Sequence, residues 1–184
     1  MSKLGPIAVI AAMTGCSAGY TTGNTSSVLL IIAATNGGAQ LKSDVLLKGS
    51  IVSDSVELAI AIRFKNPNIA TVPSIPSAVI IDRYEISYRR SDGRGVEGQD
   101  VPYRISGNIN TAFDVKTSGT DPLSLEVVRA QAKLEPPLRN LQNAGGSIIV
   151  TMFADITLHG HTISGQTVTG TSSLQIDFAD WADQ

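Results

Sequence analysis

Apolar and polar residues alternate with a period of two along much of the chain, which is typical of strands with one buried face. The clearest example covers residues 56–65, where Glu57, Arg63 and Lys65 fall on the polar side. The apolar side holds Val56, Leu58, Ile60, Ile62 and Phe64. On a helix these residues would be scattered around the whole circumference, so the pattern predicts a strand.

Three further segments repeat the alternation, at residues 78–90, 148–158 and 168–178. The residues expected to face inward are Ile80, Tyr84, Ile86 and Tyr88 in the first segment, Ile148, Val150, Met152, Ala154, Ile156 and Leu158 in the second, and Val168, Leu174, Ile176 and Phe178, with the small Gly170 and Ser172, in the third. These segments are also predicted to be strands.

Four less regular segments are strand candidates, at residues 28–34, 45–52, 103–115 and 123–134. The first is apolar enough for a strand buried on both faces. The last fits a strand or a short helix, and we favour a strand because Val127 and Val128 are β-branched and a proline pair closes the segment. A short helical turn is expected near residues 137–144, with Pro137 in its first turn and Gly145 as a cap.

Turn signals separate these segments. Loops are expected at residues 91–95 and 66–68, and tight turns at His159-Gly160-His161 and at residues 164–166. Seven or eight short strands predict an all-β fold, a two-sheet antiparallel sandwich of the immunoglobulin or fibronectin type. This domain would span residues 28–184.

The first sixteen residues have the pattern of a secretory signal. Lys3 precedes an apolar run at residues 4–13, and Thr14-Gly15-Cys16 follows. The run is too short to cross a bilayer, which takes about 20 apolar residues. Met13-Thr14-Gly15-Cys16 resembles the lipobox of bacterial lipoproteins. The alternative is a buried cysteine in a short N-terminal strand.

The lipoprotein resemblance implies cleavage before Cys16, so residues 1–15 would be a signal peptide. Cys16 would then carry acyl chains, and two or more chains give stable membrane anchoring. Ser17 fits the family's preference for the outer membrane. Residues 16–27 are rich in Ser, Thr, Gly and Asn and would form a flexible tether. The domain would then lie in the bacterial cell envelope, facing the periplasm or the surface.

The segment over residues 56–68 is an alternating strand that ends in Asn66-Pro67-Asn68, and it is followed by the tyrosine-bearing segment 84–88. This order resembles the water-stress and late-embryogenesis (LEA14/WHy) domain. The resemblance implies a fibronectin-like sandwich and carries no catalytic residues. Asn-Pro-Asn is also ordinary turn chemistry.

Composition narrows the function classes. The chain has 184 residues and a net charge of −2, which gives no electrostatic reason to bind nucleic acid. Its single cysteine excludes an intrachain disulfide. We find no paired carboxylates and no phosphate-binding loop, so neither catalysis nor a cofactor is expected.

Two candidate sites stand out. His159 and His161 would share one face of a strand and approach a metal ion together, although a site needs a third ligand. The alternative is a pair of exposed hairpin histidines, and we expect no metal. The other candidate is an arginine-rich hairpin with interleaved tyrosines, which together could bind an anionic glycan, a phosphate-rich polymer or a protein. Its residues are Arg83, Tyr84, Tyr88, Arg89, Arg90, Arg94, Tyr103 and Arg104.

Nearby acids balance these arginines, so a solvated sheet face is the alternative. We therefore expect a non-enzymatic, lipid-anchored envelope domain that acts as a binding, scaffold or adhesion module. Its partners would be the membrane, through Cys16, and an envelope protein or polysaccharide. The two other hypotheses are a WHy-like stress-protective domain and an accessory hydrolase or metal-binding protein using His159 and His161.

Overall fold

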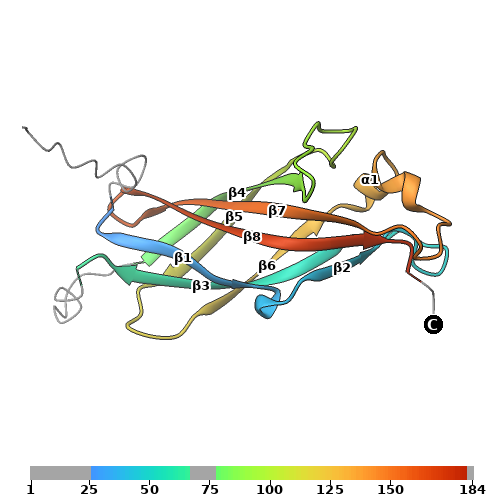
Figure 1. Cartoon of the computed structure of the whole chain (residues 1–184). Coiled ribbons are helices and arrows are strands. Elements are labelled where there is room, and N and C mark those ends of the chain that lie inside the picture. The colour runs from blue at the N-terminus through green and yellow to red at the C-terminus, as the bar shows by residue number, and fades with distance from the viewer. Residues whose placement is uncertain (1–25, 67–77, 182–184) are drawn as a thin grey trace, which may run out of the picture.

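The computed structural model describes residues 26–66 and 78–181. Strands make up most of this part of the chain, with three short helical segments between them (Figure 1). The strands are β1 (Val28–Thr35), β2 (Leu41–Asp44), β3 (Asp54–Phe64), β4 (Ala78–Arg90), β5 (Ile105–Asp114), β6 (Asp121–Val128), β7 (Val150–Thr162) and β8 (Thr167–Ala179). The helical segments are η1 (Asn36–Gly38), α1 (Ala130–Lys133) and η3 (Leu138–Leu141).

The strands form two sheets that lie one above the other (Figure 1). One sheet has the order β1-β3-β6, and the other has the order β2-β8-β7-β4-β5. Neighbouring strands are antiparallel except β2 and β8, which run parallel. The predicted all-β, two-sheet sandwich is confirmed, with this one parallel pair as a departure. Likeness to immunoglobulin domains in particular stays a prediction.

The alternating residues supply the core between the sheets. Leu58 and Ile60 of β3 and Ile156 and Leu158 of β7 belong to one hydrophobic cluster, and all four are almost fully buried. Burying a side chain of this size stabilises the fold by about 1.5–3 kcal/mol. The inward-facing sets predicted for 56–65 and 168–178 are confirmed, since their large members are buried or packed against the core.

The predicted phase of β4 is wrong at its start. Val79 and Ile81 are buried, whereas Ile80 is only half-buried. The cause is a β-bulge at Asp82: Ile81 and Arg83 pair with the consecutive residues Gly160 and His159 of β7. One extra residue moves every earlier side chain to the opposite face of the sheet.

Two strand boundaries differ from the prediction. The strand expected at residues 45–52 lies at 41–44 instead, because Lys48 and Gly49 adopt positive φ angles of 47° and 75° and turn the chain. The segment 123–134, expected as one strand, divides into β6 and α1. The β-branched pair Val127-Val128 ends β6, and the good helix formers Ala130-Gln131-Ala132-Lys133 form α1 just after it.

The helical turn expected near residues 137–144 is confirmed by η3. Two further expectations about buried residues are wrong. The strand β1 is not buried on both faces, since Ile31 is 38% exposed. Ile148, expected to face inward, lies before β7 and is 51% exposed.

His159-Gly160-His161 is not a turn but part of β7. A side chain at Gly160 would overlap the carbonyl oxygen of Ile80 in β4, so the glycine allows the two strands to approach. The expected turn at residues 164–166 is confirmed, with Gly165 at φ 81°.

Candidate functional site

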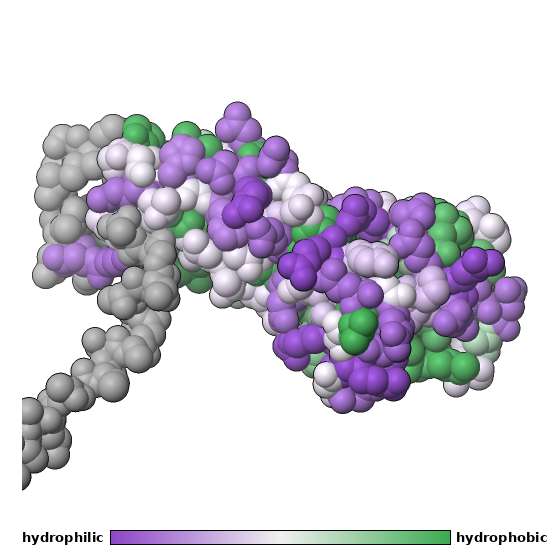
Figure 2. Space-filling view, turned by 90° about the horizontal axis from the view of Figure 1, so that it is seen from above, coloured by the Kyte–Doolittle hydropathy of each residue, from purple (hydrophilic) through white to green (hydrophobic). Residues whose placement is uncertain are grey.

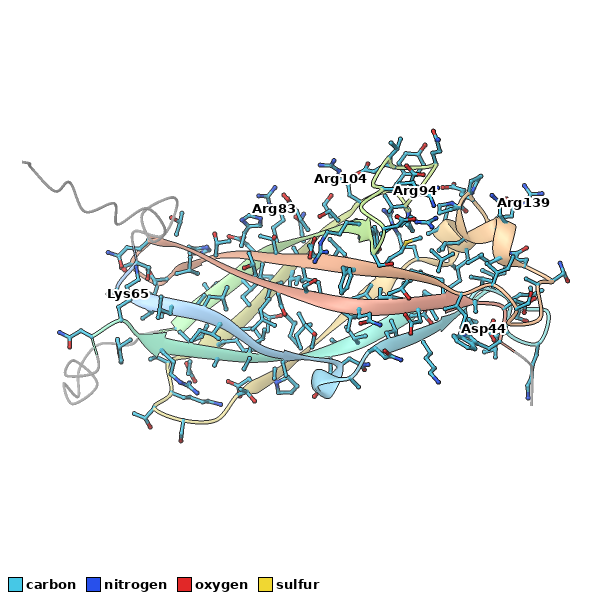
Figure 3. All side chains as sticks on the ribbon, viewed as in Figure 1. Asp44, Lys65, Arg83, Arg94, Arg104 and Arg139 are labelled. Carbon is cyan, nitrogen blue, oxygen red and sulfur yellow. The ribbon has the colours of Figure 1, made fainter. Side chains whose placement is uncertain are left out.

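Each predicted arginine lies next to an acid. Figure 3 shows Arg83, Arg94 and Arg104 projecting from the upper side of the molecule, which is the outer side of the five-stranded sheet. The ion pairs are Arg83 with Glu85 (2.7 Å), Arg89 with Asp155 (2.8 Å), Arg90 with Asp92 (2.9 Å), Arg94 with Asp92 (2.7 Å) and Arg104 with Glu97 (2.8 Å). These pairs balance the arginine charges locally, so the cluster does not form a strongly positive surface.

The structure does not bring Tyr84 and Tyr88 to the face of Arg83 and Arg89. Tyr88 is buried between the sheets, where its hydroxyl donates a hydrogen bond of 2.7 Å to the Val127 carbonyl of β6. Desolvation by this burial is the main cause that raises the pKa of Tyr88. Tyr84 packs against Gly107 of β5, and only Tyr103 is well exposed. Alternation explains the separation, because Arg83 and Arg89 occupy odd positions of β4 and the two tyrosines occupy even positions.

The tip of the arginine hairpin is built around Asp92. Its carboxylate accepts hydrogen bonds from Arg94 (2.7 and 3.0 Å) and from Arg90 (3.2 Å). The hydrogen bonds from Arg94 are the main cause that lowers the pKa of Asp92 to about 2. This carboxylate is a structural clamp of the loop.

The histidines lie on the outer face of β7, as the spacing predicts. The Nδ1 atom of His161 lies 3.0 Å from Asp82, and the Nε2 atom of His159 lies 3.8 Å from Glu85. Each imidazole thus has its own carboxylate neighbour. Within residues 26–66 and 78–181, no three His, Cys, Asp or Glu side chains gather closely enough to hold a metal ion.

Cys16 and the rest of the proposed signal and tether up to residue 25 lie outside the described residues. In the part of the chain that is described, none of the helices has the length and apolar character needed to span a bilayer.

A hollow of about 540 Å³ lies on the outer face of the five-stranded sheet. Its floor includes Arg89, Phe153, Ser173 and Gln175, and one side is formed by residues 35 and 38–40. We call this hollow the Arg89 groove. Seen from above in Figure 2, the surface over this sheet is mostly hydrophilic or intermediate in hydropathy.

The floor of the Arg89 groove is held by cross-strand contacts. Arg89, Phe153 and Gln175 lie side by side on β4, β7 and β8. The Arg89 guanidinium lies 4.4 Å from the centroid of the Phe153 ring, donates to Asp155 at 2.8 Å and reaches Ser173 at 3.4 Å. These contacts restrict the rotamers of Arg89 and fix the direction of its remaining N–H groups.

The side of the groove depends on a tight turn at η1. Asn36, Gly37 and Gly38 have φ angles of 49°, 63° and 85°, a conformation that favours glycine and asparagine. The Asn36 side chain donates to the carbonyl oxygens of Ala39 (3.1 Å) and Gln40 (3.3 Å). Gln40 then accepts a hydrogen bond of 3.1 Å from the Gln175 amide, which ties the side of the groove to its floor.

A second hollow of about 90 Å³ lies beside the groove on the same face. Glu85, Ser87, Arg104, Asp155 and Thr157 line it. Since Asp155 is paired with Arg89, this ion pair stands between the two hollows. The polar surface therefore continues from β8 across β7 to β4.

Of the groove residues, sequence reasoning identified only Arg89. Gln40, Phe153, Ser173 and Gln175 occupy outward positions that look like an ordinary solvated face. The Asn36-Gly37-Gly38 run is a turn signal in the sequence, but it does not reveal that the turn faces Gln175. That contact depends on the parallel pairing of β2 with β8.

No protein-family model matches the chain, and a comparison with curated proteins finds no match either.

Proposed function

We propose that the protein is a non-enzymatic binding module of a bacterial cell envelope, with the Arg89 groove as its binding surface. The observation that carries this proposal is the fixed arrangement of hydrogen-bonding groups around the groove. Gln40 is held by Gln175, and Arg89 is held by Asp155 and Phe153. A ligand would meet side chains that are already ordered, which lowers the entropy lost on binding.

The chemistry of the groove favours binding over catalysis. Its lining residues carry amides, hydroxyls and a guanidinium but no imidazole or thiol. Asp155, the carboxylate next to Arg89, already forms an ion pair with it. General acid–base catalysis needs a group placed to exchange a proton, and none of the groove residues has that role.

The proposed location rests on the sequence. Cys16 would carry the lipid, and residues 17–27 would link it to β1. The described chain enters at one end of the sandwich, and the loop after β4 lies with α1 at the opposite end (Figure 1). Arg89 is the last residue but one of β4, so the groove lies toward the end that holds the loop after β4. A tethered domain can therefore present it to other envelope components.

The anchor is tested by the intact mass of the protein from a bacterial membrane fraction, next to a Cys16→Ser variant. We expect the loss of residues 1–15 and the addition of acyl groups at Cys16, and the variant should lack both. An unprocessed, non-acylated mass for the natural chain would contradict the envelope location.

The groove is tested in cells with a diazirine photo-crosslinking amino acid at Ser173, and with the same group at Thr169 as the matched control. Both positions are on the outer face of β8, but only Ser173 lines the groove. We expect an adduct from position 173 and none from position 169. Equal adducts from both positions, or none from position 173, would overturn the proposed binding surface.

A further inference from the structure

We infer that the ligand of the Arg89 groove is an uncharged saccharide chain. This inference rests on the proposed function and adds the chemical class of the ligand. The groove presents donors and acceptors close together: the amides of Gln40 and Gln175, the hydroxyl of Ser173 and the guanidinium of Arg89. Sugar hydroxyls donate and accept at the same atom, so they suit such a mixed surface.

The charge balance of the groove argues against an anionic ligand. Arg89 is the cation of the lining, and the Asp155 carboxylate already holds it through hydrogen bonds of 2.8 and 3.4 Å. An anion would have to approach Arg89 beside this carboxylate and displace it or be repelled by it. An uncharged hydroxyl can instead bond to N–H groups of Arg89 and to the carboxylate without breaking the pair.

The shape of the surface favours a chain over a compact ligand. Arg89, Phe153 and Gln175 lie in a row across three strands, and Gln40, the residue before β2, extends this row, which at the usual strand spacing covers about 14 Å. The smaller hollow continues this surface beyond the Arg89–Asp155 pair. Two adjacent hollows, separated by an ion pair, can take successive units of an oligosaccharide.

The groove is also too polar for a predominantly apolar ligand. Phe153 is the aromatic residue of the floor, and the Arg89 guanidinium lies over its ring. Small-molecule pockets are usually lined mainly by apolar side chains, and this groove is not. Binding would depend on several hydrogen bonds, each contributing little, which favours a repeating ligand.

The test uses the purified full chain, labelled with ¹⁵N, and a panel of uncharged hexasaccharides made of glucose, mannose, galactose or N-acetylglucosamine. A sulfated hexasaccharide and an uncharged hexapeptide are added in parallel. We expect at least one uncharged sugar to shift the amide signals of the groove at about 10 mM or below, an affinity in the range of weak binding. This binding should not change with salt, since no net charge is neutralised.

Gln175→Ala should weaken the binding about tenfold, because it removes one hydrogen-bonding group from the floor. Thr169→Ala on the same strand and Arg139→Met on the exposed surface of η3 are the matched controls and should bind like the natural chain. The amide spectrum of each free variant shows whether it is folded. If a folded Gln175→Ala binds the sugar unchanged, the site is elsewhere and the inference is wrong.

Two outcomes separate this inference from the proposed function. If the hexapeptide or the sulfated sugar shifts the groove signals and no uncharged sugar does, the groove binds a ligand but the inferred class is wrong. The adduct formed at position 173 in cells gives the same distinction. If periodate removes the cross-linked ligand from the protein, the ligand is a saccharide, as inferred. If the cross-linked ligand resists periodate and only protease degrades it, the inferred ligand class is wrong, but the proposed binding module stands.

Discussion

The ammonium group of Lys133, which is fully buried, lies 2.9 Å from the carboxylate of Asp54. The same nitrogen donates a hydrogen bond of 2.7 Å to the backbone carbonyl of Asp44, and Ser43 donates to Asp54 at 2.6 Å. Lys133 thus joins α1 to β2 of one sheet and to β3 of the other. A buried charge is tolerated only with such partners, so this group connects three elements at one end of the sandwich.

Replacement of Lys133 by methionine should lower the free energy of unfolding by about 3 kcal/mol, because it removes the partner of the Asp54 carboxylate. The double variant Lys133→Met/Asp54→Leu should recover part of this loss, since both charges are then gone. Urea denaturation measures both changes, with Arg139→Met on the exposed surface as the control. A single variant as stable as the natural chain would show that the pair contributes nothing.

Tyr88 should make the protein unstable in alkali. Burial raises its pKa in the folded state, so the stabilisation is fully present below the ordinary tyrosine pKa and is lost as the pH rises above it. We expect the free energy of unfolding to fall with pH above about 10, the ordinary value for tyrosine. Tyr88→Phe should flatten this decline, and it should cost about 1 kcal/mol at neutral pH because Val127 loses its hydrogen bond. In Tyr103→Phe, which changes an exposed tyrosine, the decline should persist.

The sequence predicted the strands better than the relations between them. Alternation identified β3, β7 and β8 and most of the core, because apolar and polar residues alternate in the sequence of a strand with one buried face. No sequence pattern indicated the bulge at Asp82, which reverses the faces on which Val79 and Ile80 were expected.

The candidate site was harder to predict, for a related reason. The arginine-rich hairpin was visible as composition, but the partner of Arg89 is Asp155, which lies 66 residues away in the chain. Gln40 and Gln175 are 135 residues apart and meet only because β2 pairs with β8. Local pattern defines which residues face outward, and the pairing of strands decides which of them form a groove.

The carboxyl group of Asp92 should titrate near pH 2 in an NMR titration, below its ordinary value of 3.8. Since this pKa is depressed by folding, the contribution of Asp92 is present above the ordinary value and is lost as the pH falls toward 2. Arg94→Gln should move the pKa upward, because the hydrogen bonds from Arg94 are the largest cause of the shift. Arg83→Gln, remote from this loop, should leave it where it is.

Gly160→Ala should destabilise the protein by about 1–3 kcal/mol, the usual cost of forcing extra atoms into a packed region. The new methyl group would overlap the Ile80 carbonyl oxygen and push β4 away from β7. Gly95→Ala is the matched control, because nothing lies within 4 Å of a side chain added there. Thermal unfolding compares the two variants, and equal melting temperatures would show that β4 and β7 are not in close contact at Gly160.

The turn at Asn36 should control the order of the groove side. Asn36→Ala removes two side-chain hydrogen bonds and places alanine at a φ of 49°, which costs about 1–2 kcal/mol for a residue with a β-carbon. Asn36→Gly removes the same bonds without this cost. Hydrogen exchange at Ala39, whose N–H bonds to the Asn36 carbonyl, should accelerate in both variants and more in the alanine variant. Hydrogen exchange at Gly165, in a different turn, should be the same in all the proteins and serves as the internal reference. If only the alanine variant exchanges faster, backbone conformation holds the turn, and the Asn36 amide has no part in positioning Gln40 against Gln175.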